Sequence, residues 1–294
     1  MHEVQKEQTM RYRTTLGDFL RARRSVRQPE DVGLDRDTSR RVPGLRRDEV
    51  ARLAGMSAEY YVRLEQGRVT SPSRQVVEAI ARALRLDHVE TEYLGRLARR
   101  DAGYGPMSAP SPTETAETYQ RLESILRQWS ATPAFLSDSN MDIIAANELM
   151  VTLTDGEIAP GKNIVQSTFE PHQRAALVRW EQSARDAVAS LRYSADEDAP
   201  RFQQLVDELS EDIDFTRIWH RYEVRHHGDA ETEAATEFGT ISFGIRNFML
   251  PDLRGCTVTV WHAAQGSRAA AAFDELRARR EAASVQQDLL ASSA

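Results

Sequence analysis

The first hundred residues of the chain repeat apolar side chains at helical spacing. Leu16, Phe19 and Leu20 stand at positions i, i+3 and i+4, so they share one face of a helix over 14–24. The same kind of spacing predicts further helices over 46–54, over 57–66, from Ser71-Pro72 onward and over 88–99. The polar stretch between the first two contains proline and glycine and is typical of a loop.

Two of these predicted helices are separated by only a few residues. In the first of them Val50, Leu53 and Ala54 face inward, and Gly55 ends it because glycine takes up the positive φ of a tight turn at little cost. Ser57 then supplies a capping hydroxyl for the second helix. Two short helices joined by a glycine-containing turn are typical of a helix-turn-helix.

The second half of the chain mixes strands with helices. Residues 103–114, GYGPMSAPSPTE, have no apolar periodicity and predict a linker. After a helix near 115–130, two short apolar runs broken by Asp-Ser-Asn, PAFLSDSNMDIIAAN, predict a hairpin. The remaining predicted elements are helices over 171–192, 199–210 and 213–222, strands in EFGTISFGIRNFML and CTVTVWHAA, and a last helix over 267–282.

This element order predicts an all-α helix-turn-helix domain followed by an α+β domain with a sensor-like layout. The predicted boundaries are residues 1–102 for the helix-turn-helix domain, 103–114 for the linker, 115–283 for the α+β domain and 284–294 for a frayed C-terminal tail.

Charge is distributed unevenly along the chain. The net charge is −7, but residues 1–105 hold 21 Lys and Arg against 16 Asp and Glu, or +5. Residues 106–294 hold 17 against 29, or −12, and the two parts sum to −7. A basic front half favours a polyanionic partner, and together with the helix-turn-helix pattern it predicts double-stranded operator DNA.

In a helix-turn-helix the second helix lies in the major groove, and its first outward residues meet the base edges. Ala58, Glu59 and Arg63 hold those positions, where they can contact a thymine methyl group, cytosine and guanine respectively. The predicted phosphate contacts are Arg40, Arg41, Arg46, Arg47, Gln66, Arg68 and Arg74. Because one short helix reads few base pairs, we expect a homodimer.

The segment from Arg40 to Gly67 resembles the Cro/repressor-type (XRE) helix-turn-helix, and more narrowly its MmyB-like branch. It follows the branch's pattern R-R-x-P-G-L-R-R-[DE]-E-V-A-x-L-A-G-x-S-x-x-Y-Y-x-R-L-E-Q-G almost without a gap. A looser resemblance continues to about Leu276, through FEPHQRAALVRWEQSARDAVASLR, FTRIWHRYEV and CTVTVW. The resemblance implies a PAS-like C-terminal domain that binds a small hydrophobic, fatty-acid-like ligand.

Several positions depart from that family's pattern. Ala146 stands where the family has a tryptophan, and Gln166 where it has an arginine. Ala235-Thr236 replaces a His-Pro pair, and Gln265 replaces a turn proline. A smaller side chain at position 146 predicts a pocket of different size or shape, and therefore a ligand that differs from the family's typical one.

The ligand-pocket candidates are inward apolar side chains with a few polar neighbours. They are Phe135, Ile143, Ala146, Asn147, Phe169, Trp180, Arg192, Trp219, Phe243 and Trp261. Helical and alternating spacing also demands core residues, so only part of this set is expected to line a pocket. Arg192 ends an apolar helix, where it either pairs with an acidic ligand headgroup or lies on the surface.

The sequence carries no positive sign of catalysis. The G-x-S-x-G, H-E-x-x-H, Walker and G-x-G-x-x-G patterns do not occur. His226 and His227 would diverge on a strand, and no cysteine or carboxylate cluster completes a zinc site. We therefore expect no enzyme activity, no metal and no cofactor.

No run approaches 18 apolar residues, so we expect no membrane span, and a cytoplasmic location. Two alternative functions stay open from sequence. One is a helical module that binds another protein instead of DNA. The other is an enzyme fused to a DNA-binding domain.

Overall fold

The computed structural model describes residues 12–35, 42–69, 71–101, 112–226, 228, 230–250, 253 and 255–291. The chain divides into two units. The first comprises Met1–Ser108 together with Glu197–His226, and the second comprises Ala109–Asp196 together with His227–Ala294. The sequence predicted one uninterrupted C-terminal domain over 115–283, whereas residues 197–226 belong structurally to the first unit.

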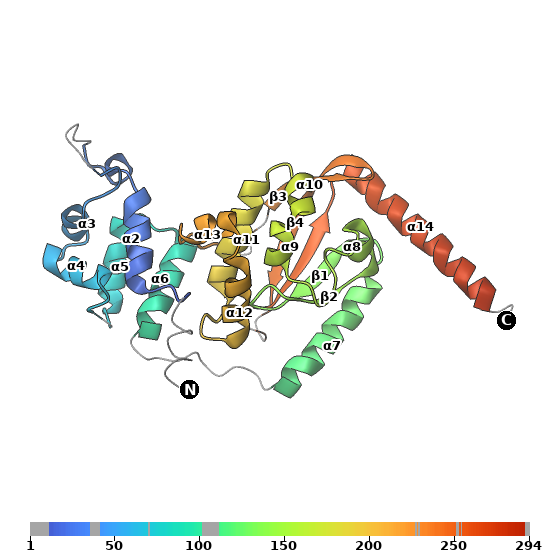
Figure 1. Ribbon diagram of the computed structural model, residues 1–294, viewed down its shortest axis with the longest axis horizontal. Helices are drawn as coiled ribbons and strands as arrows, with labels where there is room; N and C mark the ends of the chain where they lie inside the picture. Colours follow the sequence, from blue (N-terminus) through green and yellow to red (C-terminus); the bar gives the residue numbers. More distant parts are fainter. Residues whose placement is uncertain are drawn as a thin grey trace. The chain divides into compact units, whose positions relative to one another are not determined.

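Helices make up the regular structure described in the first unit (Figure 1). Its N-terminal part contains α2 (Leu16–Val26), the short 3-10 helix η1 (Pro29–Val32), α3 (Arg47–Leu53), α4 (Ala58–Glu65), α5 (Arg74–Ala83) and α6 (His88–Asp101). The segment from the middle of the chain adds α12 (Pro200–Leu209) and α13 (Ile213–Trp219).

The inward face predicted for the first helix is confirmed, because Leu16, Phe19 and Leu20 are all buried. The prediction for α3 is wrong at one position. Leu53 is 37% exposed, and Ala51 is buried beside Val50 instead. Since α3 has only seven residues and packs against both α4 and α5, these two neighbours decide which side chains point inward.

The second unit is built on an antiparallel sheet. Among the described residues its strands are β1 (Ala134–Ser137), β2 (Ile143–Ala146), β3 (Ala230–Thr236), β4 (Gly239–Met249) and β5 (Thr257–His262), in the order β2-β1-β5-β4-β3. The helices around it are α7 (Pro112–Gln128), α8 (Glu148–Leu153), α9 (Ile164–Phe169), α10 (Pro171–Ala176), α11 (Trp180–Ser194) and α14 (Arg268–Ala291). This architecture confirms the predicted α+β class.

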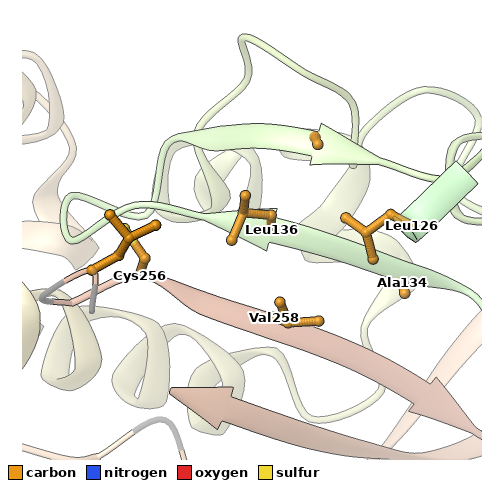
Figure 2. Packing of buried hydrophobic residues seen from close by; sticks show 7 residues of the cluster. Leu126, Ala134, Leu136, Cys256 and Val258 are labelled. Carbon is orange, nitrogen blue, oxygen red and sulfur yellow. The ribbon is translucent and has the colours of Figure 1, made fainter. Parts of the chain in front are cut away.

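Strand alternation divides the side chains of the sheet between two faces. On one face Leu126 of α7 packs with Leu136 of β1 and Val258 of β5, in a cluster that also contains Cys256 (Figure 2). On the opposite face Phe135 packs with residues of β2 and α8. We call this second side the inner face of the sheet.

The segment predicted as one helix over 171–192 is in fact two helices, α10 and α11. Between them Leu177 forms an antiparallel β-bridge with Ala234 of β3. β3 was not predicted from the sequence, so no break in the helix was expected at this position. Pairing with a strand distant in sequence therefore interrupts an otherwise regular helical pattern.

Two helix boundaries also differ from prediction. α5 begins at Arg74 rather than at Ser71-Pro72, because the hydroxyl of Ser73 accepts a hydrogen bond from the amide of Val76 and caps the helix. α14 continues to Ala291, so most of the predicted frayed tail is helical. In the part of the chain that the structure describes, no helix is both long and apolar enough to cross a membrane.

Candidate nucleic-acid interface and ligand-binding domain

α3 and α4 form the helix-turn-helix that the sequence predicted. Gly55 has φ +68°, and the amide of Met56 donates to the carbonyl of Ala51 at 2.9 Å, which closes the end of α3. The hydroxyl of Ser57 then accepts from the amide of Tyr60 at 3.2 Å and starts α4. Local hydrogen bonds therefore set the turn between the two helices.

α4 has one buried and one exposed side. Tyr61 and Leu64 are fully buried, whereas Ala58, Glu59 and Arg63 are exposed. Arg63 follows Glu59 by four residues, so their side chains are neighbours on the helix surface. The structure thus brings the predicted base-reading residues together on one outward surface.

Glu65, at the end of α4, holds three helices of this domain together. Its side chain is 1% exposed and accepts hydrogen bonds from Arg24 Nε at 2.5 Å and Arg47 Nε at 2.7 Å. Burial acts to raise the pKa of Glu65, but the hydrogen bonds and charges of Arg24 and Arg47 outweigh it and lower the pKa below its ordinary value. The carboxylate therefore stays ionised at neutral pH and ties α4 to α2 and α3.

Arg47 is oriented by this contact. Its Nε is bound to Glu65, while the side chain as a whole remains 49% exposed. A guanidinium group carries four further N–H donors besides Nε–H. Arg47 therefore presents a held positive charge beside the exposed side of α4.

The other predicted phosphate contacts that the structure describes lie on the surface. Arg46, Gln66 and Arg68 are exposed. Arg74 pairs with Glu78 of the same helix at 2.7 Å, and its side chain is 91% exposed. The remaining two candidates, Arg40 and Arg41, lie outside the described residues.

Half of the predicted pocket residues meet on the inner face of the second unit. Phe135 and Ile143 are buried with Met150 of α8, and Ala146 and Trp261 pack against this cluster. The ring of Phe243 stacks on the ring of Trp261 with their centroids 4.2 Å apart. This apolar surface spans β2, β1, β5 and β4.

Phe169 and Trp180 form a separate pair on α9 and α11. Their rings meet edge to face with centroids 5.6 Å apart, and the indole of Trp180 donates to the carbonyl of Thr168 at 2.7 Å. The guanidinium of Arg174 lies 4.3 Å from the centroid of the Trp180 ring. These contacts hold both aromatic side chains in defined positions.

The side chain of Asn147 is occupied by main-chain groups. Its Oδ1 accepts from the amides of Met150 at 3.0 Å and Ala134 at 3.2 Å, and its Nδ2 donates to the carbonyls of Trp129 and Thr132, both at 2.7 Å. These four bonds use its hydrogen-bonding capacity. Asn147 therefore caps α8 and fixes the start of β1.

Arg192 and Trp219 are placed differently from the other candidates. Arg192 is 1% exposed, so the surface alternative for this residue is wrong. Ser194, two residues further along α11, donates to the carbonyl of Ser139 in the β1–β2 turn. Two residues correspond to about 200° of helix rotation, so Arg192 lies on the opposite side of α11 from this contact. Trp219 belongs to the first unit, where its ring stacks on that of Phe215 at 5.6 Å.

Part of the inner face is polar, which the sequence-based prediction did not include. Ser137 pairs with Thr257 in the sheet register, and both are buried. The hydroxyl of Ser137 and the side-chain oxygen of Asn140, in the turn that follows β1, are buried without a hydrogen-bonding partner among the residues that the structure describes. Strand alternation provides the missing signal, since Ser137 follows Phe135 by two positions.

Comparison with known protein families matches both units. The model of the MmyB-like transcription regulator ligand binding domain matches residues 119–276, more than half of the chain, and a helix-turn-helix domain model matches residues 15–94. The chain belongs to the MmyB-like transcription regulators. No curated protein was found to match it.

This MmyB-like regulator thus combines a DNA-binding domain with a ligand-binding domain and is a ligand-responsive transcription regulator. The family match over 119–276 includes residues 197–226, which the structure assigns to the first unit. Among the described residues, no group of His, Cys, Asp and Glu side chains is arranged to hold a metal ion.

The role of Glu65 in the DNA-binding domain was not predicted from the sequence. This residue stands four residues after Tyr61, on the inward side of α4. An acidic residue at an inward position of an amphipathic helix is the signal that could have found it, because a buried carboxylate requires cationic or N–H partners.

Proposed function

We propose that this MmyB-like regulator binds a specific operator as a homodimer, and that a small hydrophobic, fatty-acid-like ligand in the second unit changes its affinity for DNA. α4 reads the bases, and the arginines around it contact the phosphates. Because its partner is chromosomal DNA, we place the protein in the cytoplasm.

The observation that carries the DNA-binding part is the exposed group Ala58, Glu59 and Arg63 on α4, with Arg47 held beside it by Glu65. Ala58 supplies an apolar contact, Glu59 a hydrogen-bond acceptor and Arg63 a bidentate hydrogen-bond donor. These are the chemical types that distinguish base pairs in the major groove. A held arginine loses less side-chain entropy on meeting a phosphate than a mobile one does.

A salt titration of DNA affinity tests this part. Duplexes selected from a random pool by the full-length protein should bind with an affinity that falls steeply as salt rises, because bound arginines release counterions. Replacing Arg46 and Arg47 with Ala should flatten this dependence. A slope near zero, unchanged in the double variant, would instead support the alternative of a helical protein-interaction module.

The ligand-binding part is supported by the two kinds of surface on the inner face. Phe135, Phe243 and Trp261 are apolar, whereas Ser137 on the same face carries a buried hydroxyl without a hydrogen-bonding partner in the described part of the chain, as does the side-chain oxygen of Asn140 in the turn after β1. An apolar surface next to a few convergent polar groups is the usual composition of a small-molecule site and suits an amphiphilic ligand.

Native mass spectrometry of protein purified without added ligand tests this second part. We expect a co-purifying mass equal to that of a long-chain acyl compound. As a complement, straight-chain fatty acids should raise the melting temperature, and chain-matched alcohols should separate the contribution of the carboxylate from that of the chain. Protein that is empty and unresponsive to either series would refute the fatty-acid-like ligand.

A further inference from the structure

Glu197 anchors the segment 197–226 to the first unit through a buried carboxylate. The residue is 4% exposed and accepts hydrogen bonds from the amide of Thr14 at 2.9 Å, from Arg100 Nη1 at 2.7 Å and from the hydroxyl of Tyr93 at 3.1 Å. Arg100 also donates to the carbonyl of Thr14. One carboxylate at the start of the segment therefore holds the residue before the N-cap of α2 and two side chains of α6.

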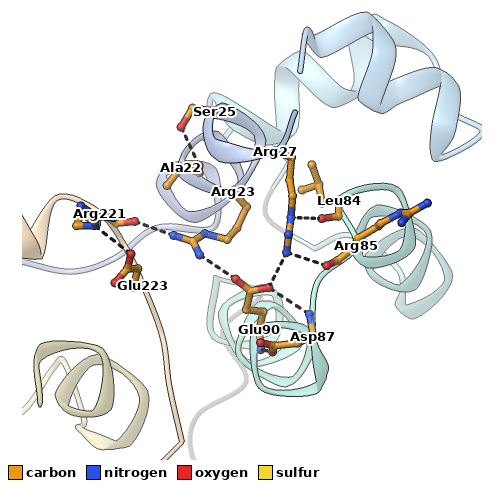
Figure 3. Close-up of polar contacts among 10 residues, drawn as sticks. All are labelled: Ala22, Arg23, Ser25, Arg27, Leu84, Arg85, Asp87, Glu90, Arg221 and Glu223. Carbon is orange, nitrogen blue, oxygen red and sulfur yellow. Dashed lines mark hydrogen bonds and ion pairs between the residues drawn. The ribbon is translucent and has the colours of Figure 1, made fainter. Parts of the chain in front are cut away.

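A second anchor lies at the other end of the segment (Figure 3). Arg23 of α2 pairs with Glu90 of α6 at 2.8 Å, and both side chains are only 9% exposed. The same guanidinium donates from Nη2 to the carbonyl of Arg221 at 2.7 Å. The segment is thus fastened near its first residue and near its last helix, to the same two helices of the DNA-binding domain.

Breaking the Glu197 anchor would leave a buried carboxylate without its donors, whereas breaking the second would leave one buried N–H of Arg23 without an acceptor while Arg23 stays paired with Glu90. A buried carboxylate or guanidinium that loses its partner keeps the penalty of desolvation without the compensating attraction. By contrast, the exposed hydrogen bond between Tyr12 and Asp207, 2.6 Å long, adds little. The two buried anchors therefore fix both ends of the segment that carries α12 and α13 to the region of α2 and α6.

The covalent chain connects the segment to the second unit at both ends. It follows α11 directly, and it leads into β3. α2 in turn contacts the recognition helix, because Arg24 binds Glu65 of α4 while the adjacent Arg23 faces the segment. A displacement of α11 or β3 can therefore reach α4 through the segment, then α2, then the contact between Arg24 and Glu65.

We infer that residues 197–226 are a coupling segment: they lie within the sequence of the ligand-binding domain but form a structural part of the DNA-binding unit, and they transmit the state of one to the other. The segment docks on the surface of α2 and α6 through Glu197 and the carbonyl of Arg221. Its role in transmission rests on the proposed function, whereas its attachment to α2 and α6 does not.

Hydrogen exchange measured by mass spectrometry on the full-length protein tests the attachment without ligand or DNA. In Glu197→Gln we expect exchange in α2, α6, α12 and α13 to accelerate together by about tenfold or more, with β1 and β5 unchanged. The matched control is Glu211→Gln, an exposed glutamate between α12 and α13, which should exchange like the wild type. If Glu197→Gln does not fold, Tyr93→Phe removes one of the three donors and should show the same pattern more weakly.

The inference is overturned if α12 and α13 accelerate while α2 and α6 do not. It is equally overturned if β1 and β5 accelerate to the same extent, because the substitution would then loosen the whole chain rather than this docking surface. Unchanged exchange everywhere in Glu197→Gln would also refute it.

A second arm adds a selected duplex to the wild type and to Glu197→Gln. In the wild type DNA should slow exchange in α4 and also in α12 and α13, whereas in the variant it should slow exchange in α4 alone. An equal response of α12 and α13 in both proteins would refute the transmission of the bound state. If DNA slows no exchange even in α4, the proposed DNA binding fails, while the DNA-free arm still decides whether the segment is attached.

Discussion

Arg47 Nε donates to Glu65 Oε2 at 2.7 Å, which links the first residue of α3 to the last residue of α4. Because Glu65 also binds Arg24 of α2, a single carboxylate sets the relative orientation of three helices. The angle between α3 and α4 determines how far α4 can enter a major groove. We therefore expect both stability and DNA binding to depend on this buried contact.

Replacing Glu65 with Gln should destabilise the protein by about 3–5 kcal/mol, because Arg24 and Arg47 lose their counter-charge and Arg24 is itself largely buried. Urea unfolding of the full-length protein measures the loss. Glu78→Gln is the matched control: it removes a carboxylate that is 44% exposed and paired with Arg74, and its effect should stay below about 1 kcal/mol. Equal losses in the two variants would contradict the role assigned to Glu65.

The contribution of Glu65 should depend on pH. Its pKa is lower in the folded protein than in the unfolded chain, so the unfolded state binds a proton first as pH falls. The stabilisation is complete above the unfolded pKa of about 4.3 and is lost as pH falls through the lower, folded pKa. Unfolding free energies of the wild type and Glu65→Gln should therefore converge as the pH is lowered from 5 toward about 3. A difference that stays constant over this range would show that charge is not the cause.

Arg63→Ala should separate base reading from phosphate contact. At a selected operator we expect a loss of about 1–3 kcal/mol in binding free energy, with little change on duplexes of unrelated sequence. Arg68→Ala is the comparison: it should weaken binding to all duplexes alike and reduce the salt dependence by about one counterion. Fluorescence anisotropy at several salt concentrations measures both, and the assignment fails if Arg63→Ala behaves like Arg68→Ala.

Gly17→Ala should destabilise the first unit by about 1–3 kcal/mol, because a Cβ atom at position 17 of α2 would overlap the main-chain carbonyl of Glu65. Gly95→Ala on α6 provides the control. There the nearest atom is Arg99 Nη1 at 3.6 Å, so the substitution should gain up to about 1 kcal/mol from helix propensity. Thermal unfolding should shift in opposite directions for the two variants, and equal shifts would argue against the close packing of α2 on α4.

Asn147→Ala should cost about 1–3 kcal/mol of stability, because it removes the cap of α8 and leaves main-chain groups of the 129–134 segment without partners. Asn147→Asp keeps the accepting oxygen but loses the donated bonds, so it should also be destabilised. Thermal unfolding measures both. Should either variant unfold like the wild type, Asn147 would be available for a ligand after all.

Local chemistry allowed the helix-turn-helix to be predicted closely. Gly55 and Ser57 set the turn through hydrogen bonds to residues within five positions, and Tyr61 and Leu64 are buried as their spacing indicates. The strands of the hairpin, β4 and β5 were also found, since alternation is visible in a short window. Such signals depend only on neighbours in the sequence.

Long-range pairing decided what was missed. β3 lacks an alternation of strongly apolar and polar side chains. It forms because β4 pairs with every residue of β3 from Ala230 to Thr236. Its bridge to Leu177 then divides the helix predicted over 171–192. Neither event leaves a mark in the residues near 177, because the partner lies more than fifty positions away.

By itself the sequence determined the helix-turn-helix, the outward position of Ala58, Glu59 and Arg63 on its second helix, and the α+β class of the second half, because periodicity, capping and turn chemistry act over a few residues. Only the tertiary structure decided that Glu65 joins α2, α3 and α4, and that Glu197 assigns residues 197–226 to the DNA-binding unit. The physical reason is that a charged side chain stays buried only where distant donors converge on it, and that convergence exists only in the folded chain.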